Sequence, residues 1–171
     1  KWEYPSTGGG AAVPDCNVTL MDDVTEWREK VHIPDPSQFD WKATYEMECN
    51  MIGAPDREHE VVDFGFGNGI FERLAALMGF EDALIAMAME PEETNALFEA
   101  ITDYKVAALD YIIEAYHPDT ITYYDEVATE RNLFMSPDTY RELIKPHHKR
   151  FAQECLKRGI IPIYHCCGHA E

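Results

Sequence analysis

The feature of this sequence that most limits its fold is a set of three short apolar segments separated by long helical ones. The apolar segments are EVVDFGF (60–66), TITYYDEV (120–127) and IIPIYH (160–165). Short apolar runs bounded by charged residues, glycine or turn formers are typical of buried strands. Because helical stretches connect them, we expect parallel strands with helical crossovers, which is an α/β fold.

The connecting segments carry clear helix signals. The strongest predicted helix covers 91–117, where Pro91 suits the first helical position and apolar residues recur at steps of three and four. Another helix should begin at Ser136-Pro137 and run to about Arg158, with a kink at Pro146. Further helices are expected over residues 24–31, 38–51, 67–80 and 81–91.

Charge and composition exclude several classes of protein. The chain has 171 residues, 32 of them acidic and 14 basic, and a net charge of −18. Nucleic acids and anionic membranes bind basic surfaces, so neither is an expected partner. No apolar stretch approaches the roughly 20 residues of a membrane helix. We expect one domain, loop-rich over 1–36 and built of β/α units over 37–171.

The five cysteines are odd in number and irregularly spaced, which does not indicate a disulfide framework. Reduced thiols are typical of the cytoplasm, and we expect a cytoplasmic protein. Cys166 and Cys167 are unlikely to form a redox pair, because neighbouring cysteines can form only a strained disulfide.

Polar side chains capable of chemistry collect where the second and third apolar segments end. In parallel α/β folds, functional groups gather at the carboxyl ends of the strands. His165 and Cys167 are two residues apart, so both side chains share one face of a strand and can reach one Zn²⁺ ion. A catalytic zinc usually takes three protein ligands. The third could be Asp125, Glu126 or His169, or it could lie beyond residue 171.

Each of these residues also has a structural interpretation. A buried cysteine is usually a small apolar residue, and a lone histidine is usually a satisfied polar group. Asp125 and Glu126 could instead cap the next helix or pair with Arg131. His147 and His148 are expected on an exposed helix surface. The stretch FGFGNG (64–69) lacks the third glycine of a dinucleotide fingerprint, and we interpret it as a tight turn from strand to helix.

The region from Asp125 to His169 resembles the uroporphyrinogen decarboxylase superfamily, most closely its cobamide-dependent methyltransferase branch. The shared pattern is an acidic strand end, a Ser-Pro helix start, a proline within that helix, a glycine, an apolar strand and His-x-Cys-Gly. Here its members are Asp125, Ser136-Pro137, Pro146, Gly159 and His165-Cys166-Cys167-Gly168. Upstream, residues 70–101 resemble the family's helix, Gly-Phe-Glu, helix, Pro-Glu stretch, and KWEYPSTGGG (1–10) resembles an early barrel loop.

The resemblance implies a partial (β/α)₈ (TIM) barrel of the uroporphyrinogen decarboxylase-like type. Such barrels typically have about 250 residues, so the chain should correspond to the middle of the barrel. A partial barrel exposes sheet edges and apolar surface, and we therefore expect a homo-oligomer.

The activity implied is zinc-dependent methyl transfer between methyl-cobamide, carried by a corrinoid protein, and a small-molecule thiol or O-methyl substrate. By resemblance, His165 and Cys167 would bind the zinc together with a further cysteine that has no counterpart here. Asp125 or Glu126 would complete the metal site or orient a ligand. Two alternatives stay open: decarboxylation of a tetrapyrrole, and a truncated domain without activity.

Overall fold

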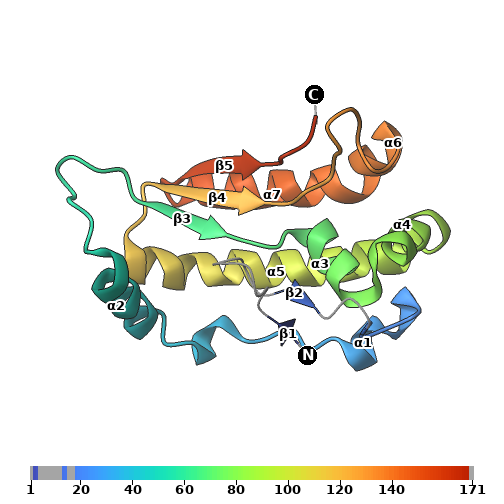
Figure 1. Ribbon diagram of the computed structural model, residues 1–171, viewed down its shortest axis with the longest axis horizontal. Coiled ribbons are helices and arrows are strands. Elements are labelled where there is room, and N and C mark those ends of the chain that lie inside the picture. The colour runs from blue at the N-terminus through green and yellow to red at the C-terminus, as the bar shows by residue number, and fades with distance from the viewer. Residues whose placement is uncertain (1, 4–12, 15–17, 170–171) are drawn as a thin grey trace.

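The computed structural model describes residues 2–3, 13–14 and 18–169, and its centre is a parallel sheet covered by helices on one face (Figure 1). The sheet has the order β3-β4-β5, with strands Asp63–Phe66, Thr120–Tyr124 and Ile161–His165. Both strand pairs are parallel, so the three carboxyl ends lie at the same edge. The predicted α/β fold with helical crossovers is confirmed.

The helices follow the predicted pattern, with small shifts at their ends. The predicted helix over 38–51 begins only at Trp41, because the Asp40 side chain caps it by accepting a hydrogen bond from Ala43 N. The helices are α1 (Trp27–Lys30), α2 (Trp41–Ile52), α3 (Ile70–Met78), α4 (Phe80–Met89), α5 (Pro91–Tyr116), α6 (Pro137–Thr139) and α7 (Lys145–Lys157). Short 3₁₀ turns occupy Val24–Glu26 (η1) and Pro36–Gln38 (η2).

Among the described residues before α2, the helical turns are η1, α1 and η2, and irregular segments connect them. Strand β1 (Trp2–Glu3) pairs antiparallel with β2 (Val13–Pro14). Most of the predicted KWEYPSTGGG loop lies outside the described residues. Among the residues that the structure describes, no helix is both long and apolar enough to cross a membrane.

Two apolar cores hold the helices in place. The first lies between the sheet and helices α5 and α7, and includes Phe66, Ile121 and Phe151. The second joins α3, α4 and the first half of α5 to the amino-terminal segment. Helix α5 runs beneath the sheet and reaches both cores (Figure 1). One long helix therefore links the sheet to the helical layer at the carboxyl ends of its strands.

The helix predicted over 136–158 is divided into three parts. Between α6 and α7, the segment Tyr140–Ile144 (η3) forms a π-helical turn, in which Lys145 N donates to Tyr140 O. Pro146 follows directly and has no N–H to continue a regular ladder. A kink was predicted at this proline, and the structure shows a π-helical widening of the helix just before it.

The predicted exposure of His147 and His148 is wrong. The His147 residue is only 8% exposed, and the His148 side chain only 11%. Helix α7 packs against both α5 and the sheet, so two of its sides contact protein. His147 contacts Asn95 on α5, with its Nε2 3.0 Å from Asn95 Oδ1, and His148 faces the sheet.

Lys105 on α5 is a buried cation, only 3% exposed. Burial, followed by the positive charge of Arg73, lowers the pKa of Lys105 to about 7, although Asp125 and Glu72 act in the opposite direction. Between this value and the usual 10.5, the unfolded chain binds more protons than the folded chain. The free energy of unfolding therefore gains a term that increases with pH in this window.

We expect Lys105→Met to remove that pH-dependent term. The variant should be stabilised relative to the wild type near pH 6, and its advantage should shrink above pH 7 by up to about 1.4 kcal/mol per pH unit. Urea unfolding of both proteins between pH 6 and 9 measures this difference. A difference in unfolding free energy that is constant across this range would contradict the assignment.

Candidate metal centre

Three side chains from two neighbouring strand ends converge on one point. Glu126 follows β4, His165 ends β5, and Cys167 lies two residues further on; their ligand atoms all lie within 4.8 Å of one another. His165 Nε2 is 3.2 Å from Cys167 Sγ and 3.4 Å from Glu126 Oε1. No other group of this kind occurs within the described ranges.

These donors fit a zinc ion in both type and spacing. Zinc accepts nitrogen, sulfur and carboxylate oxygen, and tetrahedral bonds of about 2.0–2.3 Å place ligand atoms about 3.3–3.8 Å apart. The two distances from His165 Nε2 are close to that range. The three residues therefore offer one nitrogen, one sulfur and one oxygen ligand and leave a fourth position open.

The backbone around Cys167 keeps the cluster together. Cys167 N donates to Glu126 Oε2 at 2.6 Å, which leaves the other carboxylate oxygen directed to His165. The His165 ring packs on Tyr124, with ring centroids 4.8 Å apart. A Cβ on Gly168 would lie 2.2 Å from the carbonyl oxygen of Ala128, so only glycine allows this close approach of the two loops.

The charge state of Cys167 depends on Glu126. A hydrogen bond from the thiol to the carboxylate, together with partial desolvation, raises the pKa of Cys167. The thiol therefore keeps its proton at neutral pH when no cation is bound. Metal ligation requires the thiolate, so binding would release this proton.

Asp125, predicted to complete the metal site or to orient a ligand, faces away from the cluster. It is fully buried and accepts hydrogen bonds from Phe71 N at 3.3 Å and Glu72 N at 3.0 Å, in the first turn of α3. Its Oδ2 is also 2.8 Å from His148 Nε2. Asp125 therefore caps a helix, as its structural interpretation expected, but the helix is α3, which precedes β4, and not the next helix after the strand. Arg131 pairs with its neighbour Glu130 and not with the strand end.

The Asp125 carboxylate packs against the glycine-rich turn that follows β3. A Cβ on Gly69 would lie 2.2 Å from Cβ and Cγ of Asp125, so the glycine lets the acid approach the helix start. A carboxylate of the protein thus occupies the place where a helix amino terminus would bind a phosphate. This arrangement favours the predicted tight turn over a dinucleotide site.

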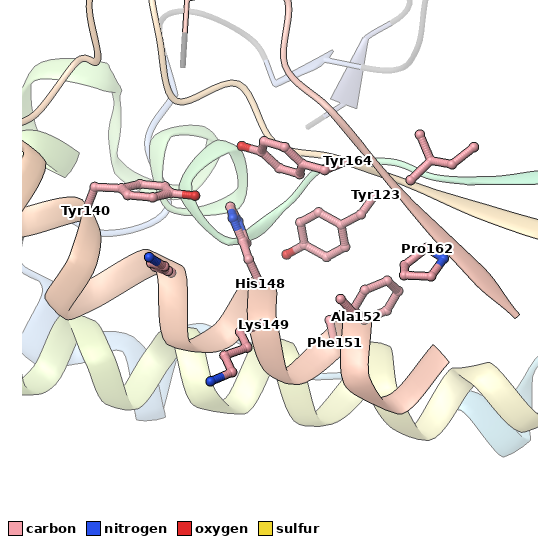
Figure 2. Close-up of a pocket in the computed structure, with 10 residues that line it drawn as sticks. Tyr123, Tyr140, His148, Lys149, Phe151, Ala152, Pro162 and Tyr164 are labelled. Atoms are coloured by element: carbon pink, nitrogen blue, oxygen red, sulfur yellow. The ribbon is translucent and has the colours of Figure 1, made fainter. Parts of the chain in front are cut away.

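Sequence reasoning missed the role of His148 as a buried neighbour of Asp125. His148 lies among Tyr123, Tyr140 and Tyr164 (Figure 2), beside a pocket of about 330 Å³. Its Nδ1 is buried without a hydrogen-bond partner among the described residues. The helical spacing of Ile144, His148, Phe151 and Cys155 was the available signal, because it places the histidine on the apolar face.

Comparisons with known proteins agree with this architecture. The sequence model for uroporphyrinogen decarboxylase (URO-D) matches residues 8–171. The chain belongs to the uroporphyrinogen decarboxylase family. The predicted resemblance is confirmed, and with it the partial (β/α)₈ barrel type of the fold.

A solved structure also resembles the chain. It is a methyltransferase from Methanosarcina mazei, with 19% sequence identity and a TM-score of 0.57. The match covers 75% of this chain and 35% of that protein, so the matched part spans about a third of the length of that methyltransferase. At this identity the likeness supports the fold alone. A comparison with curated protein sequences found no match.

Proposed function

We propose that this chain carries the metal site of a zinc-dependent methyltransferase, with Glu126, His165 and Cys167 as ligands. The observation that supports it is the convergence of these three donors at the carboxyl ends of β4 and β5. This edge is where enzymes of parallel α/β architecture place their chemistry. Glu126 is then the third zinc ligand, which the sequence alone left open between several residues.

A zinc ion bound here would supply Lewis-acid chemistry, by lowering the pKa of a substrate thiol or by polarising a methyl-ether oxygen. The protein side chains provide position and charge. The Cys167 amide fixes one oxygen of Glu126, and the Tyr124 ring supports His165. Cys167 is exposed, so the site is open to a substrate from solvent.

The proposed reaction moves a methyl group between a methyl-cobamide, carried by a corrinoid protein, and a thiol or O-methyl compound. The alternative, decarboxylation of a tetrapyrrole with several carboxylates, requires cationic groups near the substrate. Strands β3, β4 and β5 contain no lysine or arginine, and the helix-free face of the sheet carries Asp63, Tyr124 and His165 as its ionisable groups. This composition favours methyl transfer.

Metal analysis tests the site. We expect the purified wild-type protein to bind about one zinc per chain, and Cys167→Ala to lose most of it, because a ligand change should exceed the roughly 10- to 100-fold effect of outer-shell changes. Glu126→Gln should also weaken zinc binding. Elemental analysis and competition with a chromophoric chelator measure content and affinity.

The neighbouring cysteine provides a matched control. Cys166 packs against the apolar core around α3, so Cys166→Ala should keep its zinc. Equal zinc content in Cys166→Ala and Cys167→Ala would reject this metal site. Demethylation of methylcobalamin by a thiol, followed by visible absorbance, tests the transfer itself and should depend on zinc and on Cys167.

A further inference from the structure

A cavity of about 450 Å³ lies on the helix-covered side of the sheet, between α5, α3 and the amino-terminal segment 30–34. Its ionisable lining groups besides Tyr104 are all basic: Lys30, His32, Arg73 and Lys105. None of the described residues that line it is acidic, although the chain has 32 acidic and only 14 basic residues. The cavity is thus a cationic site within an acidic protein.

Lys105 is the most unusual of the groups that line this cavity. Its Nζ donates to Gly67 O at 2.9 Å and lies 3.9 Å from the centroid of the Phe66 ring and 5.0 Å from that of Tyr123. In the part of the chain that is described, no carboxylate lies within ion-pair distance of this amine. An ammonium has three donors, and a carbonyl accepts only one of them here.

A buried amine with no carboxylate at ion-pair distance lowers the stability of the folded protein. A methionine would fill the same space among the rings without the desolvation of a charge. An anion supplied from outside would provide the missing partner and would interact strongly, because the site is shielded from water. A buried cation that lines a cavity and has a strongly shifted pKa is therefore a candidate for ligand binding.

The remaining walls limit the kind of anion. Val31, Ile33, Leu77 and Ile101 give the cavity apolar surface beside the basic groups. Such a lining suits a molecule with one charged end and an apolar body. Inorganic phosphate would leave this surface without a partner, whereas a short-chain carboxylate would cover it.

We propose that this cavity binds a small organic carboxylate, with the carboxylate group at Lys105 and Arg73 and the apolar part against Leu77 and Ile101. The site lies on the opposite side of the sheet from the Glu126, His165 and Cys167 cluster. Binding requires neither zinc nor methyl transfer, so it stands or falls independently of the proposed function.

Hexanoate is a suitable probe, with hexanamide as its neutral analogue and inorganic phosphate as a purely ionic one. Titration calorimetry and thermal unfolding should show saturable binding of hexanoate by the wild-type protein, and none of hexanamide. Lys105→Met should weaken hexanoate binding at least about ten-fold, the loss of one charge-assisted hydrogen bond. The exposed Lys42→Met is the matched control and should bind hexanoate normally.

A second variant tests the cavity without touching its charges. Val31→Trp should fill the space and also abolish hexanoate binding. The proposal is overturned if wild-type protein shows no saturable hexanoate binding up to about 10 mM, or if Lys105→Met and Val31→Trp both bind it normally. Phosphate binding without hexanoate binding would overturn the carboxylate class. Unchanged zinc content in both variants would show that the metal site is intact.

Discussion

Replacing Asp125 by alanine is expected to destabilise the protein by about 3–5 kcal/mol, because several buried groups would lose their hydrogen-bond partner and each one left unsatisfied costs about 1–3 kcal/mol. The carboxylate is fully buried and accepts hydrogen bonds from two backbone N–H groups of α3, with His148 as a third neighbour. Alanine would leave the helix donors and the imidazole without an acceptor. Urea unfolding of the wild type and the variant measures the change.

The adjacent acid is the matched control for this experiment. Glu126→Gln should change the free energy of unfolding by less than about 1 kcal/mol, because Glu126 is only partly buried at the sheet edge. The same variant should weaken zinc binding, whereas Asp125→Asn, which keeps the size of the side chain, should retain zinc. Equal destabilisation by Asp125→Ala and Glu126→Gln would contradict the division of roles between the two acids.

Gly69→Ala is expected to have an effect of similar size, about 3 kcal/mol or more. The added Cβ would lie 2.2 Å from two carbon atoms of Asp125, and overpacking by even smaller clashes destabilises by about 1–3 kcal/mol. Either α3 or the end of β4 would have to move, and the hydrogen bonds to Phe71 N and Glu72 N would break. Chemical denaturation measures the loss.

Gly67→Ala, two residues earlier in the same turn, is the control. A Cβ there meets no atom within 4 Å, so the substitution should change stability by less than about 1 kcal/mol. If both variants were equally stable, the close contact between Gly69 and Asp125 would not exist in solution.

The sequence predicted the architecture well because its signals are local. Strand and helix positions follow from apolar runs and caps, and the pairing of His165 with Cys167 follows from the alternation of side chains along a strand. These features need no knowledge of distant residues. A kink was predicted at Pro146, and the π-helical turn before it was not, since its form depends on how α7 packs.

The sequence could not separate the roles of Asp125 and Glu126. Both follow β4 directly, and which acid faces α3 depends on how the chain turns after Tyr124. The buried position of His148 likewise depends on the contact of α7 with the sheet, although its helical spacing gave a hint. Lys105 was missed because a lysine within an amphipathic helix is normally exposed.

The opposite orientations of Asp125 and Glu126 separate two tasks within one turn of the chain. Substitutions at position 125 are expected to act on folding, because this carboxylate holds the first turn of α3. Substitutions at position 126 are expected to act on ligand binding at the strand ends, because this side chain lies in the cluster with His165 and Cys167. The cluster is therefore open to redesign at position 126 without a change to the scaffold.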